Sequence, residues 1–412
     1  MTDAAPKPRD AHPVLFLILF LPLGITNGYV VVTLSYILSH AGVGVGAIAA
    51  LVAWSLFPQT WKVVWAPIVD TTLNNKVWFL LSAIVIGMGM IATALVPATR
   101  DNLIFIEILV VAVSLAVSFN AMAADSLMAY ATPPSEKGRA GGWSQAGNLG
   151  GSGLGGGAGL WLAQHVHPIW ISGAVLGLIC IASSLAAIFI EEPISDHRGE
   201  SLAKSFVNVG RDVWSVVSAR TGVLALFLMT LPIGAGAASN LWSAVAGDWH
   251  ASADTVALVN GALGGVVSMV GCIAGGFICD LMDRKTAFCL FGIVSAACAV
   301  AMAFSPHTEL AFAFFVSLYA FALGFCYAAF GAVVLEAIGT GAAATKYNLL
   351  ASVSNMPIAY MTIVDGWGQE KWGSNGMLYT EAVCGVIGVC IFAAVAYTLT
   401  RLRPREKSRL DL

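Results

Sequence analysis

Apolar stretches recur along nearly the whole chain, and each is about 18 to 25 residues long, enough to cross a hydrocarbon core of about 30 Å as a helix. They lie at residues 14–38, 44–66, 77–96, 101–124, 139–163, 168–190, 221–246, 255–279, 286–305, 308–334, 342–364 and 376–400. The pattern predicts an all-α integral membrane protein with twelve transmembrane helices.

Composition excludes a water-soluble fold. Hydrophobic residues make up 58% of the 412 residues and charged residues only 10%, with a mean hydropathy of +0.82. So few charges cannot cover a water-facing surface. The net charge of −3 gives no reason to expect a nucleic-acid partner, and the lipid bilayer is the expected surrounding.

Charge density rises between residues 191 and 220, the only polar stretch long enough to join two halves. We therefore predict an N-terminal six-helix bundle at 1–190, a cytoplasmic linker at 191–220, and a C-terminal six-helix bundle with a cytoplasmic tail at 221–412. The pattern predicts two pseudo-symmetric bundles.

The positive charges indicate the orientation. Of the 20 Lys and Arg residues, 17 lie in the two tails, the linker and the connections on one side, while Arg100 and Lys371 lie on the other. The positive-inside rule then predicts a multi-pass protein of the cell (inner) membrane with both termini cytoplasmic. The first apolar stretch is full-length and has no small-residue cleavage site, so we expect no removable signal peptide.

The eight cysteines lie in or at the ends of apolar stretches without metal-ligand spacing. We interpret them as small buried apolar residues, and expect neither a metal nor a cofactor. His165 and His167 stand in a short loop without other potential ligands nearby. Because no cluster of catalytic residues occurs at membrane depth, we do not expect an enzyme.

Two markers repeat with the same offset of 210 residues. The sequence Leu21-Pro22-Leu23-Gly24 recurs as Leu231-Pro232-Ile233-Gly234, and Asp70 at the end of the second stretch recurs as Asp280 at the end of the eighth. The common offset indicates an internal duplication. Two parallel six-helix halves with a solute path between them suit transport by alternating access.

The segment Gly276-Phe277-Ile278-Cys279-Asp280, followed by Asp283-Arg284-Lys285, resembles the loop signature of the major facilitator superfamily. The resemblance implies a transporter fold that works as a monomer. The glycine would allow close helix approach, and the aspartate would cap the next helix and could also pair with a basic residue in one gating state. Candidate gating residues are Asp70, Asp125, Arg139, Asp280, Arg284 and Glu336.

Within that superfamily, three segments are similar to the muropeptide permease (AmpG-type) and acetyl-CoA transporter branch: residues 61–70, the run from Asp125 to Gly138, and residues 153–163. The family's membrane lysine corresponds to Lys62 and its aspartate to Asp125. Ala121 stands where the family has a second acid, so the specific substrate of the family does not carry over. The resemblance implies a class of function: a proton-driven secondary transporter for a polar or anionic organic solute.

Lys62 lies eight residues before the end of its stretch, hence about 12 Å inside the membrane by helical rise. Ser55, Gln59 and Lys62 are spaced to share one helical face. A cation at this depth needs a wet cavity or a partner. In one interpretation, Lys62 binds an anionic solute or pairs with a carboxylate that is released during transport. In the other, its long side chain extends to the cytoplasmic lipid headgroups.

Other polar residues of the apolar stretches suggest a path or interhelical hydrogen bonds. Glu107 is spaced in a stripe with Ser114, Ser118 and Asp125, and could carry a proton or mark the outer interface. The remaining candidates for the solute or ion pathway are Tyr29, Tyr36, Asn120, Gln145, Asn148, Asn240, Tyr327 and Asn355. The glycine-rich fifth stretch, without a preceding strand, indicates close helix packing against the other half instead of a nucleotide site.

Taken together, the sequence predicts a secondary active transporter that imports a polar or anionic organic solute with protons by alternating access. A siderophore-type permease, an exporter and a passive facilitator of the same fold are alternatives, because the sequence does not fix direction or coupling. The expected partners are a small-molecule solute, the bilayer and protons.

Overall fold

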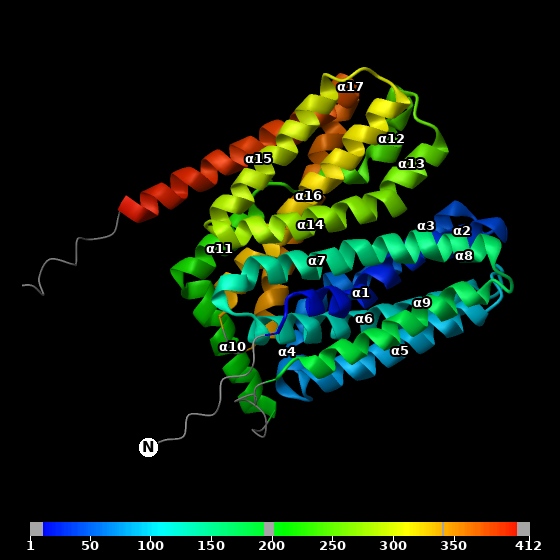
Figure 1. Ribbon diagram of the computed structural model, residues 1–412, viewed down its shortest axis with the longest axis horizontal. Coiled ribbons are helices and arrows are strands. Elements are labelled where there is room, and N and C mark those ends of the chain that lie inside the picture. The colour runs from blue at the N-terminus through cyan, green and yellow to red at the C-terminus, as the bar shows by residue number, and fades with distance from the viewer. Residues whose placement is uncertain (1–10, 193–201, 340–341, 402–412) are drawn as a thin grey trace, which may run out of the picture.

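The computed structural model describes residues 11–192, 202–339 and 342–401, and the elements within these ranges are all helices. The predicted all-α class is therefore confirmed. The helices gather into two groups that lie side by side, one coloured blue to green and the other green to red in Figure 1. Residues 1–10, 193–201, 340–341 and 402–412, which include parts of the predicted tails and linker, lie outside the described residues.

The N-terminal group extends from Val14 to Phe189. The first span is continuous from Val14 to His40 through α1, η1 and α2, and the second is bent by 53° between α3 and α4. The elements are α1 (Val14–Gly28), η1 (Tyr29–Leu34), α2 (Ser35–His40), α3 (Val45–Thr60), α4 (Lys62–Thr71), α5 (Asn75–Leu95), α6 (Leu103–Ala131), η2 (Pro134–Glu136), α7 (Lys137–Gly153), η3 (Leu154–Ala158), α8 (Gly159–His165), α9 (Trp170–Ser183) and η4 (Ser184–Phe189).

The C-terminal group extends from Arg220 to Arg401. Its last helix, α17, joins two helices at Gly373, whose φ of 70° breaks the helical path. The elements are α11 (Arg220–Thr230), η5 (Ala237–Asn240), α12 (Trp242–Val245), η6 (Ala246–Trp249), α13 (Ala253–Asn260), α14 (Ala262–Leu281), α15 (Arg284–Ala303), α16 (Glu309–Ile338) and α17 (Ala343–Arg401).

Between the groups lies α10 (Leu202–Ser218), within the predicted linker. This helix contacts α4, α11 and α17 and lies across one end of the bundle (Figure 1). We call this the α10 end, and the other the opposite end. Val207 and Trp214 of α10 are 62% and 69% exposed, so this helix presents apolar side chains outward.

Eight described helices are long and apolar enough to cross a membrane, or ten if each of two bent pairs is one span. Two features explain why this is fewer than the twelve predicted stretches. The fifth stretch is rich in glycine, which lowers its hydropathy, and the single element α17 covers two stretches, one on each side of the break at Gly373.

The seventh stretch, predicted as one helix over 221–246, is broken. Helix α11 ends at Thr230 and helical structure resumes only at Ala237. Pro232 lacks the N–H that would continue the helix, and Gly234 and Gly236 have φ of 58° and 71°. A Cβ at Gly234 would also collide with the Cys326 Sγ atom, so glycine is required there on both counts.

Helix α7 packs tightly against α1 on one side and α14 on the other. A Cβ at Gly28 of α1 would collide with the Ser152 carbonyl oxygen, and one at Gly142 of α7 would meet the Gly276 Cα of α14 at 2.8 Å. The glycines thus let backbones touch, as small residues do between membrane helices. Packing against the other half was predicted, whereas the equally close contact with α1 was not.

We predict that Gly28→Ala destabilises the protein by about 1–3 kcal/mol, because the added methyl group overpacks the α1–α7 contact. The measurement is the temperature at which half of the detergent-solubilised protein remains monodisperse. Gly210→Ala on α10, where a Cβ meets open space, is the control and gains up to about 1 kcal/mol from helix propensity. Equal transition temperatures for the two variants would contradict this account of the packing.

Candidate functional site

A cavity of about 180 Å³ lies between the two helix groups. Its wall takes residues from α1, α4, α6, α7, the break after α11, α15, α16 and α17, so both groups contribute. The polar members are Lys62, Asp125, Gln145, Asn148, Tyr327, Tyr347, Ser354 and Asn355, and the aromatic members without a polar atom are Phe20, Phe288 and Phe330. A few polar groups in an apolar, aromatic wall are typical of a site for an organic small molecule.

Lys62 and Asp125, a cation and a carboxyl group, both line this cavity. Lys62 is the first residue of α4, next to the bend in the second span. Its half-buried side chain forms part of the cavity wall. The Asp125 side chain is 1% exposed, and its Oδ1 atom has no hydrogen-bond partner in the described part of the chain.

Asp125 was predicted at a helix end, as a gating residue, and its position differs. Helix α6 continues to Ala131, which places Asp125 about 9 Å inside the helix by axial rise. Its Oδ2 atom accepts a hydrogen bond from Asn348 Nδ2 of α17 at 3.3 Å. Asp125 thus links the two groups within the cavity.

Five predicted pathway residues and one predicted gating residue, Asp125, meet at this cavity; the five are Lys62, Gln145, Asn148, Tyr327 and Asn355. The polar residues of α7 and α17 face one another there because α7 packs between the groups. Asn240 lies beside the cavity on η5, where its Nδ2 atom donates to Thr362 Oγ1 at 2.9 Å.

Two predicted pathway residues join helices of the N-terminal group instead. Asn120 is 1% exposed, and its Nδ2 atom donates to the Phe79 carbonyl oxygen and to Ser82 Oγ, each at 3.1 Å. Gln59 donates to the Ser114 carbonyl oxygen at 3.3 Å. These amides satisfy backbone and hydroxyl groups between α5, α6 and α3, the alternative that the sequence left open.

Tyr29, Tyr36 and Glu107 also lie away from the cavity. Tyr29 is buried inside the N-terminal group, and Tyr36 packs on His40 with ring centroids 3.9 Å apart near the opposite end. Glu107 begins the second turn of α6 and is half-buried. The stripe from Glu107 to Asp125 therefore runs along α6 without forming one connected polar path.

Two aspartates of the repeat cap helices of the opposite group at the α10 end. Asp70 of α4 accepts hydrogen bonds from the Ala344 and Thr345 N–H groups at 3.2 and 2.9 Å, at the start of α17. Asp280 of α14 accepts from the Gly138 and Arg139 N–H groups at 2.7 and 3.1 Å, at the start of α7. A carboxylate on a helix N-terminus satisfies unpaired donors and complements the helix dipole.

The expectation that Asp280 caps the next helix was therefore wrong, since Asp283 has that role. The Thr286 N–H donates to Asp283 Oδ2 at 2.9 Å at the start of α15. Burial tends to raise the pKa of the Asp283 carboxyl, but the hydrogen bonds from Thr286 and the charges of Lys285 and Arg284 hold the pKa below its usual range. Asp280 instead pairs with Arg139 Nε at 2.9 Å, across the two groups.

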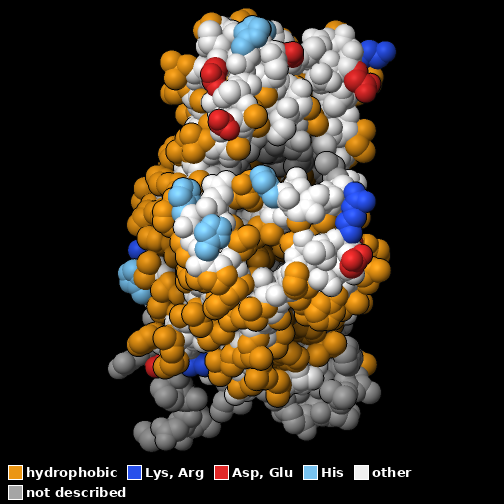
Figure 2. Space-filling view, turned by 90° about the vertical axis from the view of Figure 1, so that its right-hand side faces the viewer, with side chains coloured by type: hydrophobic (Ala, Val, Ile, Leu, Met, Phe, Trp, Pro, Cys, Tyr) orange, Lys and Arg blue, Asp and Glu red, His pale blue; other side chains and the backbone are white. Residues whose placement is uncertain are grey.

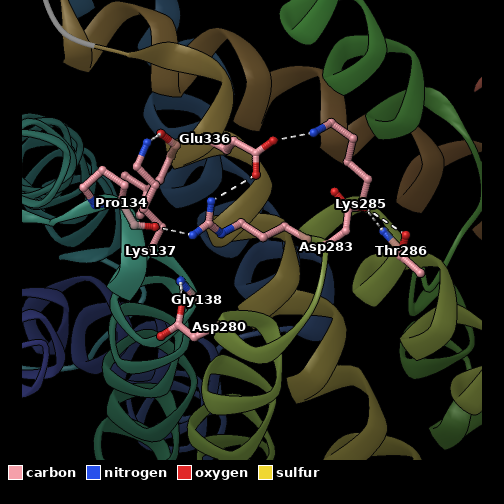
Figure 3. A network of polar contacts seen from close by, with 10 residues as sticks. Pro134, Lys137, Gly138, Asp280, Asp283, Lys285, Thr286 and Glu336 are labelled. Atoms are coloured by element: carbon pink, nitrogen blue, oxygen red, sulfur yellow. Dashed lines mark hydrogen bonds and ion pairs between the residues drawn. The ribbon is translucent and has the colours of Figure 1, made fainter. Parts of the chain in front are cut away.

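An ion network extends this contact (Figure 3). Glu336 of α16 pairs with Arg284 at 3.0 Å and with Lys285 at 2.5 Å. Arg284 also donates to the Pro134 carbonyl oxygen of the N-terminal group, and Lys137 Nζ donates to the Leu335 carbonyl oxygen at 2.7 Å. These contacts close the α10 end between the groups.

The opposite end has a different surface. Figure 2 views that face and shows it hollowed between the upper and the lower group of helices. The cross-group hydrogen bonds described above lie at the α10 end or at the cavity. The structure is therefore closed toward the α10 end, with its hollow facing the opposite end.

Sequence reasoning missed one polar cluster, in the C-terminal group. The Asp365 side chain is 0% exposed and that of Glu381 6%, and Tyr319 Oη donates to Glu381 Oε1 at 2.7 Å. Asp365 falls just after the predicted stretch 342–364 and Glu381 near the start of the stretch 376–400, and neither was singled out as a candidate. In the structure the helix continues through Asp365 and breaks only at Gly373, and both carboxyl groups are buried.

We predict that Asp280→Ala opens the α10 end and increases the N-ethylmaleimide labelling rate of Cys279, which is 1% exposed and lies against Gly138. The variant removes the cap on α7 and the partner of Arg139, whereas the control Asp283→Ala removes only a cap on α15 within its own group. Mass spectrometry gives the rate at Cys279, with exposed Cys390 as internal standard. Faster labelling in both variants alike would contradict a cross-group role for Asp280.

Known proteins of the same fold can now be compared. Among solved structures, the chain is similar to the E. coli fucose:proton symporter FucP (TM-score 0.68, 14% identity, 93% of this chain and 98% of that chain). It is also similar to the human organic anion transporter MFSD10 (0.69, 14%, 92% and 98%) and to the proton:xylose symporter XylE (0.64, 12%, 92% and 95%). At these identities the likeness concerns the fold.

No curated protein matches the chain in sequence. Residues 14–362 match the family described as the Major Facilitator Superfamily, a range that includes the N-terminal group, most of the C-terminal group and every residue that lines the cavity. The fold, the cavity between two groups of membrane helices and this match agree, and the chain belongs to the major facilitator superfamily of membrane transporters.

Proposed function

We propose that this protein is a proton-coupled secondary transporter that imports an anionic organic solute, similar in class to the muropeptide permeases. The observation that carries the proposal is the pair of Lys62 and Asp125 in the wall of the cavity between the groups. A lysine at the centre of a membrane helix costs about 2.5–3.5 kcal/mol on insertion scales, so such residues usually serve transport.

The pair suits an anion that exchanges with a resident carboxylate. Without solute, Asp125 is the counter-ion of Lys62. A solute carboxylate or phosphate that reaches Lys62 replaces that partner, while Gln145, Asn148 and Asn355 offer amide donors and acceptors nearby. Phe20, Phe288 and Phe330 supply an apolar surface for the solute's organic part. These features favour an organic anion over a simple inorganic ion.

The proposed orientation follows the charge distribution. The basic residues gather at the α10 end, which we take as cytoplasmic, so both termini lie in the cytoplasm of a cell whose inner membrane holds the protein. The cavity then faces the outside while the contacts of Asp70 and Asp280 close the inside. The halves 1–190 and 221–412 would rock about the cavity and break these contacts to release solute inward.

We predict that Lys62→Ala weakens uptake of the transported solute by about 10- to 150-fold in apparent affinity, the equivalent of one charge-assisted contact of about 1.5–3 kcal/mol. The assay is accumulation of radiolabelled muropeptides, acyl-CoA, ferric siderophores and dicarboxylates in proteoliposomes, with and without an inward proton gradient. Lys371→Ala, which removes an exposed lysine near the opposite end, is the matched control and should transport like the wild type.

Each alternative has its own outcome in this assay. Equilibration that ignores the gradient would identify a passive facilitator, and accumulation only with the reversed gradient would identify an exporter. A ferric siderophore as the accumulated solute would identify a siderophore-type permease. Unchanged uptake by Lys62→Ala would overturn the role given to the lysine.

A further inference from the structure

Among the described residues, no cation pairs with the buried carboxyl groups of Asp365 and Glu381. Both belong to α17, on the two sides of the break at Gly373, and they lie within hydrogen-bonding reach of each other. Neither residue forms an ion pair with a Lys, Arg or His of the described ranges. Two adjacent buried carboxylates cannot both be ionised without a large electrostatic cost.

Three of the four carboxyl oxygens of the pair lack a hydrogen-bond donor among the described residues. Among the described residues, no N–H or O–H group donates to either Asp365 oxygen or to Glu381 Oε2, whereas Glu381 Oε1 has the Tyr319 hydroxyl. Buried polar atoms without a partner are rare in proteins. One added proton on Asp365 would give a partner to two of these three oxygens, because the resulting O–H donates to Glu381 Oε2 and leaves a single negative charge on the pair.

The other titratable groups near the pair are weak acids. They are Tyr319 and Cys326 on α16 and Cys384 on α17. The neighbouring elements contribute neutral groups: Trp242 of α12 packs edge-on against the Tyr319 ring at 5.4 Å, and Ser295 of α15 contacts Cys326 Sγ at 3.4 Å. A proton is thus the species that this site is built to take.

The pair is also connected to the cavity. Asn355, Ile358, Thr362 and Asp365 recur at helical spacing and so share one face of α17. Asn355 and Ile358 line the cavity, and Thr362 accepts the hydrogen bond from Asn240. Asp365 lies about 10 Å beyond Ile358 by helical rise, on the side of the hollow that faces the opposite end.

We propose that Asp365 and Glu381 share one proton, and that this proton is the one that moves together with the solute. The proton enters from the opposite end and binds an Asp365 oxygen. The resulting O–H group donates a hydrogen bond to Glu381 Oε2. Loss of the proton leaves two negative charges, whose repulsion separates the helices on the two sides of Gly373. This inference rests on the proposed function for its second part, while the shared proton stands independently of any solute.

The first experiment tests the proton alone, by infrared difference spectroscopy of the protein in lipid nanodiscs during a pH titration. We expect a titrating carbonyl band of a protonated carboxyl group that is lost in Asp365→Asn and in Glu381→Gln. Glu370→Gln, a matched change at an exposed position of α17, keeps the band. A band unchanged in both variants of the pair would overturn the shared proton.

Tyr319→Phe covers the case in which the neutral variants do not fold. It keeps both carboxyl groups and removes only the hydrogen bond to Glu381, so the band is expected to remain and to shift in frequency and titration midpoint. An unshifted band would overturn the assignment to this pair.

The second experiment tests coupling with the solute that the panel above identifies. In Asp365→Asn we expect loss of accumulation driven by the proton gradient, with solute exchange retained, and in Glu370→Gln no loss. Loss of gradient dependence in Asp125→Asn but not in Asp365→Asn would move the proton to the cavity and overturn the proposal. If the wild type accumulates no solute of the panel, the proposed function fails, and the infrared result still decides on the shared proton.

Discussion

The contact on which the observed arrangement depends is a carboxylate of one helix group lying on the first turn of a helix of the other. Asp70 and Asp280 each receive two backbone N–H groups at the starts of α17 and α7. Such a contact is strong while the helix ends meet and is lost entirely when they part, since the donors point along the helix axis. It therefore stabilises the state in which the helix ends meet, and it contributes nothing once they have separated.

The glycines of α7 determine how close the two groups come. Because backbone meets backbone at Gly28 and at Gly142, α7 is held between α1 and α14 with little side-chain volume on either face. Because few side chains interlock at such contacts, the helices can tilt relative to one another. The same helix brings Gln145 and Asn148 to the cavity, so the packing surface and the proposed solute site are two faces of one element.

The sequence predicted most of the fold and part of the site. Apolar length and the repeat were sufficient for an all-helical membrane fold, because helices alone satisfy their backbone groups within lipid. Pairing across the groups was not predictable: Asp280 caps α7 rather than α15, since the docking of the groups, absent from local sequence, decides which N-terminus is near. Lys62 was singled out because a charge at membrane depth is rare. Asp365 was missed because the end of its helix was placed too early.

The two copies of the duplicated motif show why a repeat does not fix local structure. Leu21-Pro22-Leu23-Gly24 lies within continuous helix, where Gly24 allows the approach of α7, whereas Leu231-Pro232-Ile233-Gly234 breaks the chain with a left-handed glycine. The surroundings select between two conformations that the same residues can adopt.

The first half of α17 contributes to four of the features described above. Thr345 at its start receives the Asp70 cap, Asn348 reaches Asp125, Asn355 faces the cavity, and Asp365 lies within the carboxyl pair. Residues 343–372 form one helical segment, with Pro357 inside it. We therefore expect a movement beside Gly373 to shift the start of the same segment, and so to favour release or formation of the Asp70 contact more than 20 residues away.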